Sequence, residues 1–168
     1  FNLITLKPVI YVCNVDEKSI LEGNKFTKDL SESIKEDIIL ISAEIESQIS
    51  SLSSADQAEY LESLGLEQSG LNKIIKSGYQ TLSLITYFTS GEQETRAWTV
   101  TSGSKAPDAA GKIHSDFQSG FIRAETISYD DFVECAGEIK AKELGKMRSE
   151  GKEYVVQDGD VMHFLFNN

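Results

Sequence analysis

Two short apolar runs in the first quarter of the chain end abruptly in polar residues. Val9–Cys13 is followed by Asn14, and Ile38–Ile41 is followed by Ser42-Ala43. Uninterrupted apolar runs of this length predict strands buried on both faces, as in a parallel sheet. The segment 18–37 between them has a helical pattern. Strand, helix, strand and helix in this order predict an α/β sheet that carries polar residues at the carboxyl ends of its strands, where ligands bind.

The first half of the chain has four segments with helical patterns. They are 18–37, with Phe26, Leu30 and Ile34 on one face, then Ala43–Ser50, 54–64 and Gly70–Gln80. Ser54 and Gln57 have capping-box spacing at the start of the third segment, and Gly65 is expected to end it in the left-handed conformation. The last two helices are expected to connect two domains.

From Leu82 onward the apolar pattern becomes alternating. Leu84–Thr89 and Thr95–Val100 flank a turn at Ser90–Glu92 and predict a hairpin. The further elements expected are a helix over 107–117, a strand over 121–127, a helix capped by Asp130 over 130–144, an extended run at 154–156, a turn at 158–159 and a strand over 161–166. This outline is that of a β-grasp domain, an α+β fold in which a sheet wraps one main helix.

The change of pattern divides the chain into residues 1–83 and 84–168, and both parts are acidic. The first carries seven Lys or Arg against 13 Asp or Glu, and the second nine against 14. This balance argues against strong non-specific affinity for nucleic acid, which depends on cationic side chains. The sequence has no apolar run long enough to span a membrane. Cys13 and Cys135 lack metal or redox spacing, so we expect Cys13 to be a core residue and the setting to be reducing and cytoplasmic.

The residues after the two apolar runs are candidates for binding a nucleotide base. No phosphate loop of the form G-x-x-x-x-G-K-[ST] accompanies them. Taken alone, Asn14 and Glu17 are better explained as polar residues that cap a loop than as residues that read a base. However, Asn14-Val15-Asp16-Glu17 followed by Ser42-Ala43 has the order of the two base-reading loops of GTPase-type domains. Glu17 replaces the usual Asp and Val15 the usual Lys, which favours adenine over guanine.

These loops and later motifs resemble the YchF/Obg-like ATPases along essentially the whole chain. The further matching motifs are Gly65-Leu66, Ser69-Gly70-Leu71, Gly78-Tyr79, Phe88-Thr89-Ser90-Gly91, Arg96-Ala97-Trp98, Ala106-Pro107, His114-Ser115-Asp116-Phe117, Gly120–Glu125 and Gly151–Val161. The resemblance implies a P-loop ATPase whose OBG-type G domain supplies residues 1–83 and whose TGS domain, a β-grasp module, supplies residues 84–168. Relatives have also been described as GTP-dependent nucleic-acid-binding proteins.

The resemblance further implies a cytoplasmic, monomeric protein that uses ATP and Mg²⁺, binds ribosomes and does not enter membranes. The family's phosphate loop, magnesium ligands and hydrolytic residue are expected to precede Phe1. We therefore expect a C-terminal fragment that is inactive as an ATPase by itself. Asn14 is expected to contact the adenine edge and brace the loop, Val15 to pack near the base, and Glu17 to select adenine. Ser42 and Ala43 are expected to complete the pocket.

In the second domain, four basic residues are candidates for a surface that contacts RNA or the ribosome. They are Arg96, Lys105, Lys112 and Arg123. Trp98 shares the alternation of Arg96 and is interpreted either as part of this surface or as a core residue. The two histidines lack metal-ligand spacing, so no metal site is expected. The alternative function is an RNA- or protein-binding β-grasp module that acts independently of nucleotide.

Overall fold

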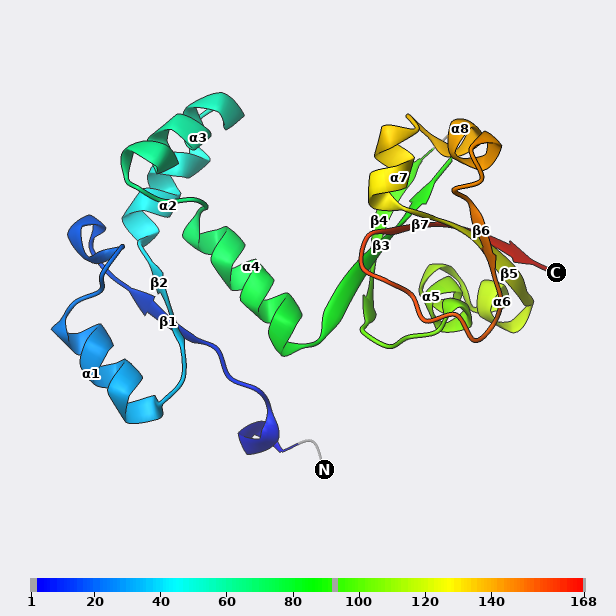
Figure 1. Ribbon diagram of the computed structural model, residues 1–168. Helices are drawn as coiled ribbons and strands as arrows, with labels where there is room; N and C mark the ends of the chain where they lie inside the picture. The colour runs from blue at the N-terminus through cyan, green and yellow to red at the C-terminus, as the bar shows by residue number, and fades with distance from the viewer. Residues whose placement is uncertain (1–2, 92–93, 168) are drawn as a thin grey trace. The chain divides into compact units, whose positions relative to one another are not determined.

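The structure is a computed structural model that describes residues 3–91 and 94–167. The chain divides into two compact units at the boundary between Leu82 and Ser83, and each unit is described by itself (Figure 1). Within the described residues, no helix combines the length and the apolar composition that crossing a membrane requires.

The first unit is built around a parallel pair of strands, β1 and β2. Its elements are η1 (Ile4–Leu6), β1 (Tyr11–Asn14), η2 (Glu17–Ser19), α1 (Lys25–Ile34), β2 (Ile38–Ile41), α2 (Ala43–Ser50), α3 (Ser54–Ser63) and α4 (Gly70–Thr81). Tyr11 lies opposite Ile38 and Asn14 opposite Ile41. Because the strands are parallel and in register, their carboxyl ends lie at the same edge, and the loops that follow them meet there.

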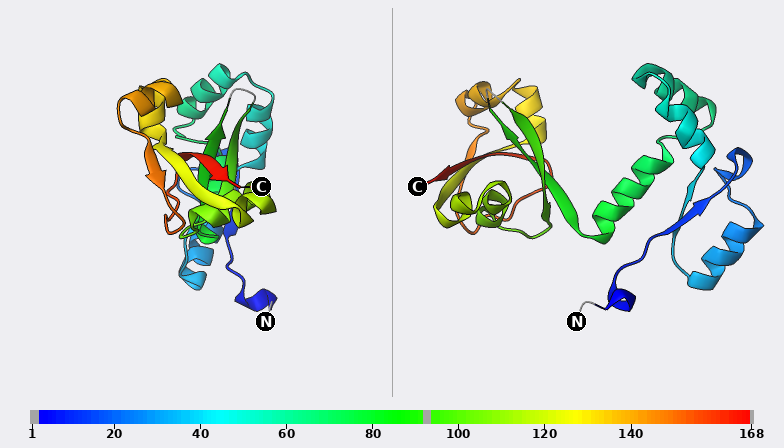
Figure 2. Two further views of the ribbon diagram at one scale, coloured as in Figure 1. Left: turned by 90° about the vertical axis from the view of Figure 1, so that its right-hand side faces the viewer. Right: turned by 180° about the vertical axis from the view of Figure 1, so that it is seen from behind.

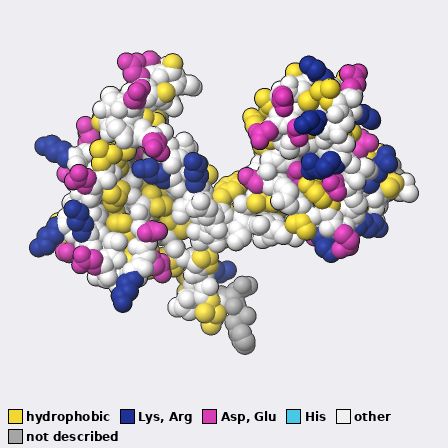
Figure 3. Space-filling model, viewed as in Figure 1, with side chains coloured by type: hydrophobic (Ala, Val, Ile, Leu, Met, Phe, Trp, Pro, Cys, Tyr) yellow, Lys and Arg dark blue, Asp and Glu magenta, His cyan; other side chains and the backbone are white. Residues whose placement is uncertain are grey.

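The core of the first unit lies between the loop after β1 and helix α2. Its buried side chains are Val15, Ile20, Ile45, Ile49 and Leu66. The prediction that β1 is buried on both faces is wrong for the described residues, because β1 pairs only with β2 and Val12 is 41% exposed. The apolar face predicted for α1 is not fully buried either, since the Phe26 side chain is 80% exposed. Hydrophobic side chains lie open on the face of this unit seen in Figure 3.

The second unit is a five-stranded mixed sheet in the order β4-β3-β7-β5-β6. Its elements are β3 (Leu84–Ser90), β4 (Thr95–Thr101), α5 (Ala106–Ile113), α6 (Ser115–Ser119), β5 (Phe121–Ser128), α7 (Tyr129–Glu134), α8 (Glu138–Glu143), β6 (Arg148–Glu150) and β7 (Asp160–Phe166). The pair α5 and α6 lies on one side of the sheet and the pair α7 and α8 on the other (Figure 2).

Both faces of this sheet are packed. On the α5 face, Tyr87, Ala124 and Phe164 lie in one buried cluster, and the Tyr87 hydroxyl donates a hydrogen bond to the Ala109 carbonyl at 2.8 Å. On the opposite face, Ile127 packs with residues of α7 and α8 in a smaller cluster. The alternation read from the sequence thus corresponds to a sheet covered by helices on two sides.

Two predicted helices are interrupted in the structure. The helix expected over 107–117 breaks at His114, which is extended (φ −157°, ψ 145°) and whose Nδ1 accepts a hydrogen bond from the Asp116 amide to start α6. The helix expected over 130–144 breaks at Ala136-Gly137, where both residues have positive φ. A side-chain cap and a glycine interrupt these helices locally. Apolar spacing does not register either feature, so by itself it predicted single helices.

Several predicted boundaries also shift. Ser53 rather than Ser54 caps α3, and Ser128 rather than Asp130 caps α7. In each case the serine side chain accepts a hydrogen bond from the backbone N–H of the residue three positions later. Residues 154–156 form no strand and make one isolated bridge, between Val155 and Lys105. The turn predicted at Ser90–Glu92 extends outside the described residues.

Candidate functional site

The Asn14 side chain joins the two loops that follow β1 and β2. Its Oδ1 accepts a hydrogen bond from the backbone N–H of Ala43, the first residue of α2, at 2.9 Å. Beside it, the Val15 N–H donates to the Ile41 carbonyl at 2.8 Å. Since Oδ1 must face the donating amide, the orientation of the Asn14 amide follows from this bond. The Nδ2 group has no hydrogen-bond partner among the described residues and remains a free donor.

Asp16 and Glu17 have different roles although they are adjacent. The Asp16 Oδ1 accepts from the Ser19 N–H at 3.0 Å and caps η2. Glu17 is exposed, and its carboxylate makes no hydrogen bond or ion pair with any residue in the part of the chain that the structure describes. Asp16 therefore shapes the loop, while the Glu17 carboxylate is exposed and has no partner among the described residues.

Ser42 and Val15 lie inside the framework of the site. Ser42 is 2% exposed and caps α2 through a long bond of 3.5 Å from the Ile45 N–H to its Oγ. Val15 is 9% exposed and packs in the core with Ile45 and Leu66. Little of either side chain is open to a ligand. Asn14, Glu17 and Ala43 are exposed, so the sequence-predicted residues divide into an outer set and a supporting set.

A contact that the sequence pattern did not reveal fixes α4 to this region. The Glu46 carboxylate, on α2, accepts a hydrogen bond from the N–H of Gly70, the first residue of α4, at 2.6 Å. A Cβ at position 70 would lie 2.8 Å from Ile41 Cγ2 and 3.0 Å from Glu46 Oε1. The sequence signal for this contact was a glycine at a helix start, just after a serine cap. The close approach of Ile41 and Glu46 to position 70 explains why a glycine is found there.

The four basic candidates of the second unit do not form one cluster. Arg96 lies over the Trp98 ring, 4.2 Å from its centroid. Lys105 Nζ forms an ion pair with Glu153 at 2.6 Å, and Arg123 lies 3.6 Å from Glu125. Lys112, on α5, is exposed and has no ion-pair partner among the residues described.

The strand register separates Arg96 from Arg123. Trp98 pairs with Tyr87, so Trp98 and Arg96 lie on the α5 face. Arg123 neighbours Ala124, which belongs to the cluster on the α5 face, so Arg123 points to the other face. Trp98 is itself half-buried against that cluster, with its Nε1 donating to Thr89 Oγ1 at 2.9 Å. Trp98 therefore packs partly against the core, and its part in a surface that contacts RNA or the ribosome stays a prediction.

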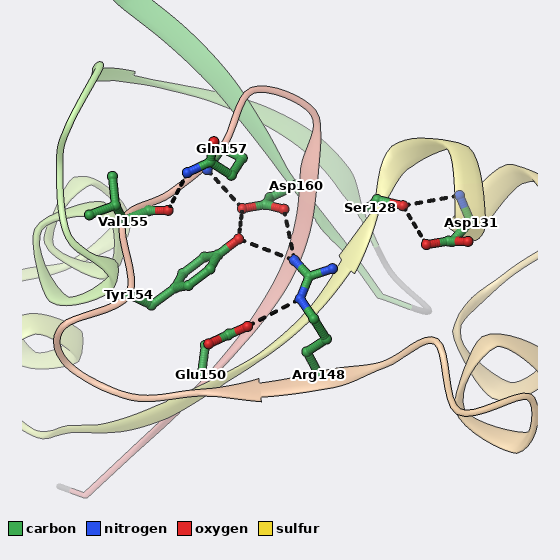
Figure 4. A network of polar contacts seen from close by, with 8 residues as sticks. All are labelled: Ser128, Asp131, Arg148, Glu150, Tyr154, Val155, Gln157 and Asp160. Carbon is green, nitrogen blue, oxygen red and sulfur yellow. Dashed lines mark hydrogen bonds and ion pairs between the residues drawn. The ribbon is translucent and has the colours of Figure 1, made fainter.

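A buried carboxylate organises the loop that precedes β7 (Figure 4). Asp160, 2% exposed, accepts from the Tyr154 hydroxyl at 2.7 Å and from the Gln157 N–H at 2.9 Å. Arg148 donates to the Tyr154 oxygen at 3.1 Å and lies 3.5 Å from Asp160. Burial, and secondly the hydrogen bond to Asp160, raise the pKa of Tyr154 to about 12. This network stabilises the loop and was not anticipated from the sequence.

The described residues contain no group of three His, Cys, Asp or Glu side chains arranged to hold a metal ion. Nor does the sequence contain a phosphate-loop motif. What this chain presents at the ends of β1 and β2 is therefore an amide donor, a carboxylate and a helix start held by Asn14.

Comparison with known proteins identifies the family. The family model YchF-GTPase_C, described as "Protein of unknown function (DUF933)", matches residues 84–167. The solved YchF GTPase of Schizosaccharomyces pombe aligns with a TM-score of 0.85 and 36% identity, over 96% of this chain and 44% of that one. A GTP-binding protein of Pyrococcus horikoshii OT3, at 19% identity and a TM-score of 0.63, shares the fold.

Curated relatives extend the similarity to the whole chain. "Ribosome-binding ATPase YchF" of Haemophilus ducreyi is 50% identical over 170 residues, which cover 99% of this chain and 47% of that protein. The protein of the same name from Bacillus subtilis is 50% identical over 171 residues, with the same coverage. The chain spans about half the length of the curated relatives it matches. It belongs to the YchF family, and the resemblance expected from the sequence is confirmed.

Proposed function

We propose that this chain is the C-terminal part of a ribosome-associated P-loop ATPase. Residues 1–83 belong to an OBG-type nucleotide-binding domain with its connecting helices, and residues 84–168 form a TGS domain of the β-grasp fold. The parallel β1–β2 pair with its adjoining helices supports the first assignment, and the five-stranded sheet with α5 against one face supports the second. The names of the relatives, which call them ribosome-binding ATPases, support the activity and the partner.

The hydrogen bond from Ala43 N–H to Asn14 Oδ1 is the observation that carries the nucleotide proposal. It holds the two loops together and leaves Asn14 Nδ2 as a donor for an acceptor nitrogen on a purine edge. In this proposal the Glu17 carboxylate, which is exposed, accepts from the exocyclic amino group of adenine. Ala43 contributes contacts from the start of α2. Ser42 and Val15 support these groups from beneath, with little of their own surface left for the base.

ATP and Mg²⁺ are the cofactors of this proposal, and the residues of this chain bear only on the base. A purine end held by Asn14 and Glu17 would orient the nucleotide, while groups for phosphate and metal would come from other parts of the longer protein. We expect the 168-residue chain alone to show no ATP turnover. Equilibrium binding of ATP and GTP to the longer protein tests the base preference, and a preference for GTP would contradict it.

The ribosome is the proposed partner, which implies a cytoplasmic protein, and nucleotide state is proposed to regulate the association. Co-sedimentation of the longer protein with purified ribosomes in ATP, ADP or no nucleotide tests both points. The proposal expects sedimentation that differs between nucleotide states. Equal sedimentation in all three conditions would favour the alternative, in which the second unit binds RNA or protein independently of nucleotide.

A further inference from the structure

Strand β4 forms one edge of the five-stranded sheet, and its backbone geometry shows which groups face outward. Ser102 N–H donates to the Ser83 carbonyl at 2.6 Å, and Gly91 N–H donates to the Glu94 carbonyl at 3.0 Å. In an antiparallel pair, hydrogen-bonded residue pairs alternate with non-hydrogen-bonded ones. The even-numbered residues of β4 therefore direct their N–H and C=O groups toward β3. The backbone groups of Thr95 and Ala97 point away from the sheet.

These outward groups are open in the described part of the chain. β4 has no neighbour other than β3, and the β3–β4 register runs without a shift from Leu84–Thr101 to Ser90–Thr95. Both Thr95 and Ala97 are exposed. Their backbones are thus available as a template for another strand.

The two edges of the sheet differ in how they resist such pairing. The β6 edge is three residues long and carries Arg148 and Glu150, which pair with each other. β4 is seven residues long, contains no Pro, Gly, Lys, Asp or Glu, and is dominated by Thr, Ala and Val. Its single charge, Arg96, lies over the Trp98 ring. Protein edge strands that must not pair usually carry lysine, proline or a bulge, and β4 has none of these.

A groove on the α5 face adjoins this edge. It has a volume of about 610 Å³ and is lined mainly by aromatic and apolar side chains, among them Trp98, Ile113, Phe117, Phe164 and Phe166. Trp98 belongs to both the groove and β4. Because side chains alternate along a strand, a segment paired with β4 would direct every second side chain to the α5 face, beside Trp98. This arrangement suits an apolar anchor on the incoming segment.

The charges of the second unit favour a basic protein segment over RNA. Residues 84–168 contain nine Lys or Arg against 14 Asp or Glu. Of the four basic candidates, Lys105 and Arg123 are paired with carboxylates, and Arg96 and Arg123 lie on opposite faces. RNA affinity would require several cations that neutralise phosphates together. Glu94, next to the start of β4, is exposed and complements a positive charge.

We propose that β4 binds an extended, basic segment of a ribosomal protein, which adds to the sheet as a sixth strand and places an apolar side chain in the groove beside Trp98. This inference rests on the proposed association with ribosomes, for which it names the kind of component contacted. It assigns Thr95 and Ala97 the main-chain contacts and the groove the selectivity for side chains.

A photo-crosslinking amino acid at Thr95 of the longer protein tests which molecule is bound. The matched control carries it at Ser149, an exposed residue of the opposite edge strand β6. With purified ribosomes, the proposal expects a crosslink from position 95 to a ribosomal protein that resists ribonuclease, and none from position 149. A crosslink to ribosomal RNA, or to a second copy of the chain, would overturn it.

Ala97→Pro tests the strand addition itself. Proline removes an N–H that points away from β3, so the hydrogen bonds between β3 and β4 remain. The expected result is a loss of at least about tenfold in ribosome affinity, with Ser149→Ala, at an exposed position of the opposite edge strand β6, close to the parent. If Ala97→Pro lowers the melting temperature, Thr95→Lys replaces it, because lysine protects edges and repels a basic segment.

The strand addition and the ribosome association can be overturned separately. Unchanged ribosome binding by a folded Ala97→Pro or Thr95→Lys variant overturns the strand addition and leaves the ribosome association standing. Failure of the unsubstituted longer protein to sediment with ribosomes in any nucleotide state overturns both.

Discussion

Asn14 Oδ1 accepts the backbone N–H of Ala43 at 2.9 Å, across 29 positions of sequence. The bond ties the residue that ends β1 to the residue that begins α2. It uses the Oδ1 acceptor of the Asn14 amide and leaves the Nδ2 donor for the proposed contact with a base. Bracing the loop and reading a ligand can therefore be tested separately by substitution at one position.

Asn14→Asp should preserve the brace and lose the reading function. The aspartate still accepts from Ala43 N–H, but it has no donor for a purine nitrogen. We expect thermal stability near that of the parent and nucleotide affinity lowered about tenfold or more in the longer protein. Asn14→Ala is the control, since it removes both functions and should also cost about 1 kcal/mol of stability. Equal nucleotide affinity for Asn14→Asp and the parent would contradict the role of the amide donor.

Gly70→Ala should destabilise the first unit, whereas Gly78→Ala in the same helix should not. A Cβ at position 70 would meet Ile41 and Glu46 at 2.8 and 3.0 Å, while a Cβ at position 78 would have no neighbour within 4 Å. We expect Gly70→Ala to cost about 1–3 kcal/mol. Gly78→Ala should gain up to about 1 kcal/mol from helix propensity. Urea unfolding followed by circular dichroism measures both, and equal effects would show that the joint between α2 and α4 is loose.

Val15→Lys should destabilise the first unit before it alters nucleotide preference. The Val15 side chain is 9% exposed and packs among Ile20, Ile45 and Leu66, so a lysine there displaces apolar contacts and buries part of its stem and charge. We expect a loss of about 2 kcal/mol or more, measured by urea unfolding. Glu17→Asp, at an exposed position, is the stability control and should change little. A stable Val15→Lys variant would mean that the loop opens readily.

Tyr154→Phe should weaken the second unit and change its response to alkaline pH. The substitution removes the bond to buried Asp160 and should cost about 1–3 kcal/mol. The folded pKa of Tyr154, about 12, lies above the usual value near 10, so the protonated phenol stabilises the fold fully below pH 10. This contribution is lost as the pH rises from 10 to 12.

The free energy of unfolding, measured between pH 9 and 12, should therefore decline less steeply for Tyr154→Phe than for the parent. Part of the decline remains in the variant, because burial also raises the pKa of Tyr87. Tyr129→Phe is a suitable control, since Tyr129 is exposed and its hydroxyl has no hydrogen-bond partner among the described residues. Identical slopes for the parent and Tyr154→Phe would mean that groups other than Tyr154 cause the loss of stability at alkaline pH.

Alternation and apolar runs in the sequence predicted most helices and strands. The elements and breaks that they did not predict depend on features that such patterns do not record. The helix Ala43–Ser50 and the strand Ile38–Ile41 were predicted with the bounds observed. The strand β6 was missed because Arg148–Glu150 has no apolar pattern and is paired through its backbone to β5. The break at His114 depends on a side-chain cap that periodicity does not encode.

For the candidate site, residue order predicted which loops meet but not how the side chains divide between them. Asn14 and Ala43 are 29 positions apart, and only the parallel pairing of β1 with β2 brings them together. The burial of Val15 depends on α2 and Leu66, which the motif does not contain. The Glu46–Gly70 contact likewise joins two helices whose packing no local pattern predicts.

The proposed adenine preference can be tested by the dissociation constants of ATP and GTP for the longer protein, with the native Glu17 and with Glu17→Asp. Titration calorimetry with non-hydrolysable analogues measures all four values. We predict that ATP binds the parent about tenfold or more tightly than GTP, from a base-contact difference of about 1–3 kcal/mol. We also predict that Glu17→Asp narrows or reverses this ratio. Equal affinities in the parent, or a ratio unaffected by Glu17→Asp, would contradict the assignment of this loop as an adenine reader.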